Sequence, residues 1–580
     1  MTIFDALTMI GGLCLFLFGM NVMGQALEVS AGRNLRNILA KLTNNISIGF
    51  FTGLIITMVI QSSSATTVMV VGFVNSGLLT LKQSIGVIIG ANVGTTVTAW
   101  ILSLQQINGE IFWLKLLKPS AFTPVLAVIG IFLFMFCKGE KKKNIGLIFL
   151  GFATLMTGMD TMSSAVEHIG EQQWFIDLLV LFENPLLGIL VGTLLTALIQ
   201  SSSASVGILQ IFANSTPISI ATCIPIILGM NIGTCITAML SSIGATKNGK
   251  RAAYVHLSFN IIGTFVLIAI FWPLKSFGNI EFFSQNANMW TVAACHTVLK
   301  IACTLLLLPS AGLLEKISYW LIPLDETPEQ AVVLDERLFA TPSIAIERSR
   351  EVTVDMANCA IKTLTDSLDL FDNYTPELAQ AIRDGEEKTD KYEDALGSYL
   401  VKLSNYKISA SDSAEAAMLL KLIGDFERIS DHGVNILEAV EELREKKLSF
   451  SEEARKEISV MINATREVLE YASKAFVDGD IEALAEISPL EQVIDVLKET
   501  LRSNHIARLQ KGNCSIEVGF VWSDLITDLE RTSDHCSNIA GCLIDLSNLD
   551  MNIHEHLRAI KSDDNTYKKK VSFYTEKYAV

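Results

Sequence analysis

The segment Gln61-Ser62-Ser63-Ser64-Ala65 occurs twice in this chain and decides how the rest of the sequence is read. The second copy, Gln200-Ser201-Ser202-Ser203-Ala204, lies 139 residues later. The same offset relates Gly90-Ala91-Asn92-Val93-Gly94-Thr95 to Gly229-Met230-Asn231-Ile232-Gly233-Thr234. One register over so long a stretch indicates that the N-terminal half of the chain is a duplication.

The duplicated region is apolar enough to cross membranes. Each QSSSA copy interrupts a long apolar stretch, 46–79 or 186–218, and we expect broken or re-entrant helices there. Such polar backbone at membrane depth must be buried in protein or face water. Plain spans are expected from about residue 7, and at about 84–104, 123–136, 145–163, 254–272 and 289–314.

Composition separates an apolar N-terminal part from an acidic C-terminal part. The 580-residue chain is 50% hydrophobic and 18% charged, which excludes a wholly soluble or disordered protein. Up to Pro323 it holds 16 Lys and Arg against 11 Asp and Glu, and the remainder holds 29 against 50. An acidic domain argues against nucleic acid as a partner. The ten cysteines include no C-x-x-C pair and are interpreted as reduced thiols.

Charged residues indicate that the two copies are oppositely oriented in the membrane. The basic stretch 33–41 places the first loop on the cytoplasmic side, whereas the equivalent stretch 171–180 is acidic. Conversely, the basic stretch 247–251 corresponds to 108–112, whose one charged residue, Glu110, is acidic. We therefore predict inverted repeats, a common architecture of secondary transporters with a site at the bilayer midplane.

The duplicated polar residues suit a small oxyanion and Na⁺. Serine and glutamine side chains both donate and accept hydrogen bonds, the N-terminus of a broken helix favours an anion, and freed carbonyl oxygens suit Na⁺. Alternatively, small polar residues merely pack transmembrane helices, but two motifs repeated at one offset favour binding. The candidate residues are Gln61, Ser62, Ser63, Ser64, Thr66, Asn92, Thr95, Gln200, Ser201, Ser202, Ser203, Asn231 and Thr234.

With these paired motifs, about residues 1–320 resemble the sodium/phosphate cotransporter family (type II). The resemblance implies that the QSSS regions line the path for inorganic phosphate and co-transported Na⁺, with the Asn and Thr residues of the second motif as neighbours. The runs continue as Ala65-Thr66-Thr67 in one copy and Ala204-Ser205-Val206 in the other. Which copy binds phosphate and which binds Na⁺ therefore stays open.

The C-terminal part contains a second, independent repeat. Asp425-x-Glu427-Arg428-x-Ser430-Asp431-His432 recurs 103 residues later as Asp528-x-Glu530-Arg531-x-Ser533-Asp534-His535. Long amphipathic patterns predict an all-α bundle. This region resembles a PhoU-like domain of two three-helix units, and the resemblance implies that E-x-x-x-D pairs can hold metal ions.

The acidic pairs leave two interpretations open. Carboxylates four residues apart share a helix face, and a divalent cation or Fe³⁺ would relieve their repulsion. The alternative is a solvated face on which Arg428 and Arg531 pair with the acids. We interpret His432 and His535 as capping or packing residues. The candidate ligands are Glu386, Asp390, Glu427, Asp431, Glu491, Asp495, Glu530 and Asp534.

We therefore expect an all-α polytopic membrane protein with a helical C-terminal bundle. The expected parts are a membrane domain at 1–322 with repeats at about 1–138 and 139–318, a linker at 323–342, a PhoU-like domain at 343–550 and a charged tail at 551–580.

The expected function is sodium-dependent phosphate transport across the cell membrane with a cytoplasmic regulatory domain. A membrane-anchored phosphate sensor and a phosphate exporter are the alternatives, and a homodimer stays open. An intramembrane serine hydrolase is disfavoured, and with it an enzymatic role, because the duplication places no base beside the serines.

Overall fold

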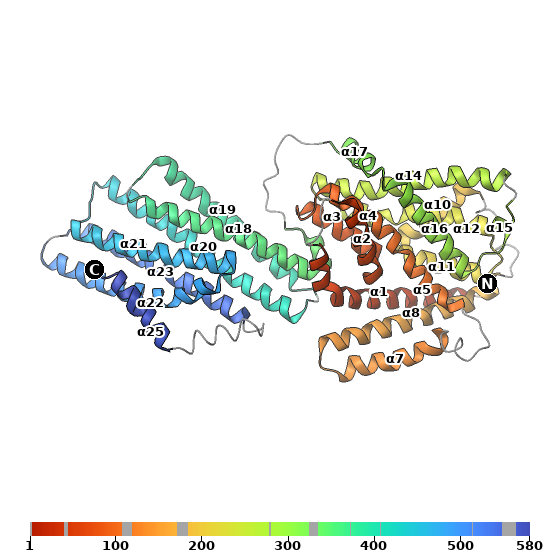
Figure 1. Ribbon diagram of the computed structural model, residues 1–580, viewed down its shortest axis with the longest axis horizontal. Coiled ribbons are helices and arrows are strands. Elements are labelled where there is room, and N and C mark those ends of the chain that lie inside the picture. The colour runs from red at the N-terminus through yellow and green to blue at the C-terminus, as the bar shows by residue number, and fades with distance from the viewer. Residues whose placement is uncertain are drawn as a thin grey trace. The chain divides into compact units, whose positions relative to one another are not determined.

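The computed structural model describes residues 3–39, 45–106, 119–170, 182, 184–277, 280–323, 334–371, 373–406, 408–512, 514–547 and 564–580. These residues form helices and no strand, which confirms the all-α prediction (Figure 1). The chain divides into two compact units, Met1–Ile344 and Ala345–Val580. We call them the membrane unit and the bundle unit.

The first copy of the membrane repeat forms a long helix, a helical hairpin, a broken helix and a further helix. The hairpin consists of α2 and α3, which meet at Gln61-Ser62, and the broken helix consists of α4 and α5, which meet at Thr95. The bounds are α1 Ile3–Leu39, α2 Ile46–Ile60, α3 Ser63–Asn75, α4 Leu81–Gly94, α5 Thr96–Ser103, the 3₁₀ turn η1 Leu104–Gln106 and α7 Pro119–Phe136.

The second copy repeats this order of elements. Its bounds are α8 Glu140–Gly170, α10 Pro185–Ile199, α11 Ser202–Ser215, α12 Ile220–Gly233, α13 Cys235–Ser241 and α14 Lys247–Phe277. Three more helices follow: α15 Glu281–Ser284, α16 Met289–Leu307 and α17 Ala311–Leu321. Positions one offset before α16 belong to α8, so α16 lies beyond the duplicated unit. The span expected at 289–314 ends earlier, at Leu307, before a turn that contains Pro309.

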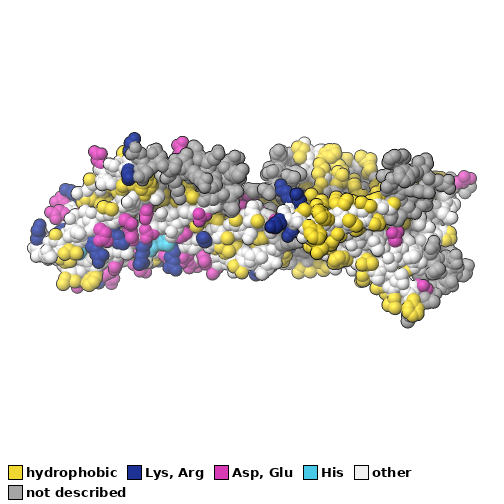
Figure 2. Space-filling model, turned by 90° about the horizontal axis from the view of Figure 1, so that it is seen from below, with side chains coloured by type: hydrophobic (Ala, Val, Ile, Leu, Met, Phe, Trp, Pro, Cys, Tyr) yellow, Lys and Arg dark blue, Asp and Glu magenta, His cyan; other side chains and the backbone are white. Residues whose placement is uncertain are grey.

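Six helical segments are long and apolar enough to cross a membrane: Phe4–Ser30, Leu81–Gln106, Glu140–Val166, Ile220–Ser241, Lys247–Ser276 and Met289–Leu307. The stretch expected at 123–136 lies in α7, whose segment Ala121–Phe136 is a shorter apolar helix. The hairpin helices α2, α3 and α10 are shorter apolar helices too. The membrane unit exposes large apolar side chains, with Leu198 82% and Leu186 76% exposed, and they gather on its surface in Figure 2. So apolar a surface requires lipid, and the protein is therefore a multi-pass membrane protein.

Glycines let the hairpins pack directly on the broken helices. A Cβ on Gly90 of α4 would lie 1.9 Å from the Phe50 carbonyl oxygen of α2. At the equivalent position, a Cβ on Gly229 of α12 would lie 2.0 Å from the Ile189 carbonyl oxygen of α10. Only glycine permits this backbone approach, which packs the first helix of each hairpin directly against its broken helix.

The predicted linker at 323–342 is not a free connector along its whole length. Residues 324–333 lie outside the described part of the chain. The following residues, 334–341, contain the short helix η2 Glu336–Ala340 and belong to the membrane unit. Leu338 is fully buried and Phe339 is 3% exposed there. We call residues 334–341 the docking segment.

The bundle unit contains two sets of three long helices, in line with the predicted tandem units (Figure 1). The bounds are α18 Pro342–Asp369, α19 Pro376–Leu403 and α20 Ala410–Glu445, then α21 Glu452–Ser473, a π-helical turn η3 Lys474–Asp478, α22 Ile481–Gln510 and α23 Ile516–Ser547. In the predicted charged tail, Asp564–Lys577 forms helix α25, where Tyr574 donates to Glu486 of α22 at 2.9 Å. Acidic and basic side chains intermingle on the surface of this unit (Figure 2).

Candidate functional site

Each QSSS motif forms the tip of a helical hairpin by the same backbone conformation. Gln61 ends α2 with φ 60°, and Gln200 ends α10 with φ 57°. This left-handed conformation is uncommon for a residue other than glycine. Ser62 and Ser201 follow in extended conformation at φ −141° and cap α3 and α11, accepting from the backbone N–H groups of Ala65 and Ala204. The expected helix breaks at the two motifs are confirmed.

The two hairpin tips meet inside the membrane unit. Ser63 Oγ lies 3.4 Å from Ser202 Oγ, and both residues are 6% exposed. Ser64 Oγ donates across the repeats to the Gln200 carbonyl oxygen at 3.5 Å. The N-termini of α3 and α11, with their free backbone N–H groups, therefore lie beside each other together with hydroxyls from both copies.

The surroundings of the two tips differ. In the first copy, Gln61 Oε1 accepts from Thr98 at 2.9 Å, and Thr66 Oγ1 lies 3.1 Å from Thr57 Oγ1. In the second copy, Thr196, the counterpart of Thr57, is fully buried, and its hydroxyl has no hydrogen-bond partner in the described part of the chain. The two halves of the candidate site are therefore chemically unequal, as the diverging sequences after the serine runs indicate.

The Asn and Thr residues of the second motif are less closely joined to the tips. The Thr95 and Thr234 hydroxyls donate to carbonyl oxygens of their own helices at 3.1 and 2.8 Å. Asn92 donates to the Ile88 carbonyl oxygen and accepts from Lys300 Nζ at 2.7 Å. Within the described residues, none of these side chains hydrogen-bonds to a QSSS residue, and neither does that of Asn231.

In the bundle unit, three of four candidate carboxylates converge in each half. The triads are Glu386, Asp390 and Asp431, and Glu491, Asp495 and Asp534, each with oxygens within 4.8 Å of one another. The two remaining candidates contact basic residues, and Arg428 also lies 3.5 Å from Asp431 of the first triad. Glu427 lies 3.3 Å from Arg428, and Glu530 lies 2.8 Å from Lys498.

Burial, together with the crowding of acids, raises the pKa values of two of these glutamates. Burial, followed by repulsion from Asp495 and Asp534, raises the pKa of Glu491 to about 7. Burial, followed by repulsion from Asp431, raises the pKa of Glu427 to about 7. Each cluster is thus electrostatically unfavourable when fully ionised, and oxygen ligands at this spacing suit a hard cation.

The two histidines of the C-terminal repeat join its halves. His432 Nδ1 lies 2.9 Å from Asp528 Oδ1, and His535 Nδ1 lies 2.9 Å from Asp425 Oδ1. Each motif therefore supplies a histidine to the aspartate of the other copy. The sequence predicts capping or packing residues, whereas the structure shows hydrogen bonds to aspartates of the other copy, and these reciprocal partners could not be read from the sequence.

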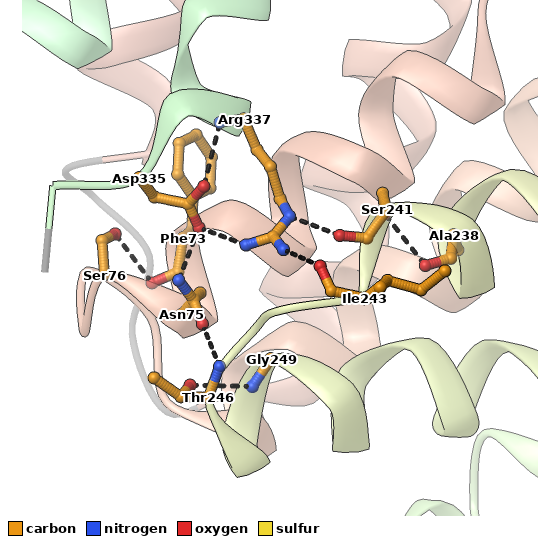
Figure 3. Close-up of polar contacts among 10 residues, drawn as sticks. All are labelled: Phe73, Asn75, Ser76, Ala238, Ser241, Ile243, Thr246, Gly249, Asp335 and Arg337. Carbon is orange, nitrogen blue, oxygen red and sulfur yellow. Dashed lines mark hydrogen bonds and ion pairs between the residues drawn. The ribbon is translucent and has the colours of Figure 1, made fainter. Parts of the chain in front are cut away.

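The docking segment ties both copies of the membrane repeat together at one point (Figure 3). Asp335 accepts from Asn75 of α3 at 2.7 Å and pairs with Arg337 at 2.9 Å. Arg337 also donates to the carbonyl oxygens of Ser241, at the end of α13, and Ile243. Asn75 Oδ1 in turn accepts from the backbone N–H of Thr246. No motif or periodicity in the sequence identifies these residues, because they lie in a short, irregular segment.

Comparison with known proteins assigns both parts of the chain. Residues 15–164 and 155–290 match the Na⁺/Pi-cotransporter family, and residues 353–440 and 458–543 match the PhoU domain. The YjbB protein of Salmonella typhimurium, whose name describes a candidate inorganic phosphate export protein, is 23% identical over 93% of this chain and 97% of its own length.

Two other relatives each match one part. The phosphate-specific transport system accessory protein PhoU homolog 1 of Thermotoga maritima is 27% identical over 35% of this chain and 86% of its own length. The human sodium-dependent phosphate transport protein 2B is 36% identical over 21% of this chain and 19% of its own length. This chain thus joins a membrane domain of the Na⁺/Pi-cotransporter family to a C-terminal PhoU domain.

Proposed function

We propose that the protein is a secondary carrier that moves inorganic phosphate across the cell membrane together with Na⁺. The observation that carries this proposal is the meeting of the hairpin tips, where Ser63 Oγ lies 3.4 Å from Ser202 Oγ. Serine hydroxyls and the free N–H groups of two helix N-termini can donate to several oxygens of one phosphate. At the same breaks, the C-terminal ends of α2 and α10 supply carbonyl oxygens of the kind that bind Na⁺.

The proposed topology places the two copies in opposite orientations with the PhoU domain in the cytoplasm. It rests on the charge of equivalent loops. Of these, residues 40–44, 107–118 and 171–181 lie outside the described residues. The basic residues Lys247 and Lys250 lie at the start of α14, close in sequence to Thr246, which bonds to Asn75 beside the docking segment. By the positive-inside rule this end of the membrane unit faces the cytoplasm.

Phosphate flux into proteoliposomes under an imposed Na⁺ gradient tests this function. Symport predicts that an inward Na⁺ gradient accumulates ³²P-phosphate above its external concentration, and that dissipating the gradient abolishes the accumulation. Export is the second candidate, favoured by the name of YjbB, and predicts phosphate efflux that needs no Na⁺ gradient. Phosphate binding without flux in either direction would instead identify a sensor.

We further propose that the two carboxylate triads of the PhoU domain bind metal ions. Each triad offers three carboxylate oxygens within 4.8 Å of one another. These are the ligands that divalent cations such as Mg²⁺ or Mn²⁺, and also Fe³⁺, take from proteins. Binding would replace the repulsion among the acids by attraction to a common cation and hold α19 against α20 and α22 against α23.

Without metal, the bundle unit should become more stable as the pH falls from 8 to 6. The pKa values of Glu427 and Glu491 are about 7 in the folded chain, above the ordinary glutamate value. The folded state therefore binds more protons than the unfolded state, and its free energy of unfolding falls as pH rises through 7. Hydrogen–deuterium exchange of α19 and α22 in the purified full chain, corrected for intrinsic pH effects, measures this change.

Added metal should abolish this pH dependence, and Glu491→Gln should weaken it. The matched control is Glu482→Gln on the same helix, because Glu482 is exposed and belongs to neither triad. Protection that is independent of both pH and metal would contradict the metal proposal and favour the ion-paired surface.

The docking segment supports a regulatory role for the PhoU domain. It holds the ends of α3 and α13, each of which belongs to a different copy of the membrane repeat, and it directly precedes α18 in the chain. A change in the bundle unit that pulls on this segment would alter the balance between conformations of the carrier. Coupling of this kind requires that the two conformations hold the segment differently.

Arg337→Ala should therefore change the response of phosphate flux to internal phosphate or metal by about fivefold or more, while transport itself persists. The substitution removes the ion pair with Asp335 and the bonds to the Ser241 and Ile243 carbonyl oxygens. Arg502→Ala serves as the control, since the Arg502 side chain is 65% exposed and its carboxylate partner is 4.0 Å away. An identical response in Arg337→Ala, Arg502→Ala and the unchanged chain would rule out this route of regulation.

A further inference from the structure

A lysine is buried in the membrane unit at the second duplicated motif. Lys300 of α16 is 2% exposed, and its Nζ donates to Asn92 Oδ1 at 2.7 Å. Asn92 lies in the motif Gly90–Thr95, whereas α16 lies beyond the duplicated unit. The positive charge thus reaches the first copy of the motif from a helix outside the duplicated unit.

The groups around Lys300 do not neutralise it. Those within electrostatic range include His256, His296, Cys235 and Cys303, and no ion pair joins Lys300 to a carboxylate among the described residues. Neither ring nitrogen of His256 has a hydrogen-bond partner there, although the residue is 1% exposed. A buried ammonium without a counter-charge is costly, and an ionisable residue within a membrane domain usually marks a functional site.

The two copies of the motif differ in the hydrogen bonds made by their asparagine side chains. The amide nitrogen of Asn92 donates to the Ile88 carbonyl oxygen, and its amide oxygen accepts from Lys300. Its counterpart Asn231 is equally buried, at 3% exposed, yet its side chain makes no hydrogen bond to any residue that the structure describes. The Asn92 amide oxygen therefore accepts from a cationic group, whereas the equivalent Asn231 oxygen accepts from no described residue.

We propose that the ammonium of Lys300 is a built-in cation that takes, at Asn92, the place that a Na⁺ ion takes at Asn231. The same amide oxygen can accept a hydrogen bond from an ammonium group or coordinate a Na⁺ ion, and either cation brings one positive charge. The inference rests on the proposed Na⁺-coupled transport and specifies it: the first copy contributes a fixed positive charge, and the second copy binds a co-transported ion. The carrier thus moves fewer Na⁺ ions per phosphate than two equivalent copies would.

The test is the number of Na⁺ ions moved per phosphate. It is obtained from the Na⁺ gradient that just balances a given phosphate gradient in proteoliposomes. Lys300→Met removes the charge and preserves the length of the side chain, so the freed Asn92 oxygen should admit Na⁺ and raise the ratio by one. Lys82→Met, which changes an exposed lysine of α4, is the matched control and should leave the ratio unchanged.

An unchanged ratio in an active Lys300→Met carrier would overturn the proposal, and so would a weaker phosphate affinity at unchanged ratio, which would make Lys300 a phosphate ligand.

If Lys300→Met does not give monodisperse protein, equilibrium binding of ²²Na⁺ to purified Asn231→Ala decides. The proposal expects one bound Na⁺ fewer than in the unchanged chain, and an equal number contradicts it. If the unchanged chain carries no phosphate, the proposed function fails, whereas ²²Na⁺ binding to Lys300→Met still tests the lysine.

Discussion

Phosphate flux should fall by roughly tenfold or more when either Ser63 or Ser202 is changed to alanine. The two hydroxyls lie 3.4 Å apart at the meeting point of the hairpin tips. Removing a buried donor leaves a phosphate oxygen, or the opposite serine, without its partner, which costs about 1–3 kcal/mol. A cost of about 1.4 kcal/mol, within this range, already corresponds to roughly a tenfold loss. Initial rates of ³²P-phosphate uptake, normalised to reconstituted protein, measure the effect.

Ser84→Ala is the matched control for both substitutions. Ser84 is a fully buried serine of the same unit, but its hydroxyl donates to the Leu81 carbonyl oxygen of its own helix at 2.6 Å. Its loss should therefore leave the uptake rate within about twofold. Full uptake by both Ser63→Ala and Ser202→Ala would mean that the hairpin tips only pack the membrane unit.

Gly90→Ala and Gly229→Ala should each prevent the membrane unit from folding. The new methyl group would lie 1.9 or 2.0 Å from a backbone carbonyl oxygen of the hairpin, and no flexible side chain can move to make room. Overpacking costs about 1–3 kcal/mol where side chains can adjust and more where the backbone must move. We expect the yield of monodisperse protein in detergent to fall by roughly tenfold or more.

Gly11→Ala provides the comparison. Gly11 lies in α1, and a Cβ there would meet nothing within 4 Å. Alanine favours a helix over glycine by up to about 1 kcal/mol, so this variant should be at least as stable as the unchanged chain. Normal yields of Gly90→Ala and Gly229→Ala would show that the hairpins do not pack as closely as the structure has them.

The duplicated motifs predicted the local structure of the site because they act locally. A polar run inside an apolar stretch favours the end of a membrane helix, and the two expected hairpin breaks fall at the QSSS motifs, with Gln61 and Gln200 in the left-handed conformation. That Ser63 and Ser202 approach each other could not be derived, since nothing along the chain specifies which polar tips meet. Their contact depends on the packing of α3 and α11 within the whole unit.

Residues outside the repeats escaped sequence analysis for a different reason. Lys300 is one charge in the apolar run of α16, and sequence alone does not distinguish a buried lysine from one whose chain reaches the interface. Asp335 and Arg337 lie in a segment that composition assigns to a linker. In the bundle unit, spacing along one helix identified Glu386 with Asp390, but the exclusion of Glu427 from the triad depends on how α20 packs on α19.

The most direct test of the central claim is the position of phosphate in an experimental structure of the full chain with Na⁺ and phosphate bound. Our account predicts phosphate between the hairpin tips, with its oxygens about 2.6–3.0 Å from the hydroxyl oxygens of Ser63 and Ser202. Phosphate bound elsewhere in the membrane unit, with both serines still paired only to protein groups, would contradict it.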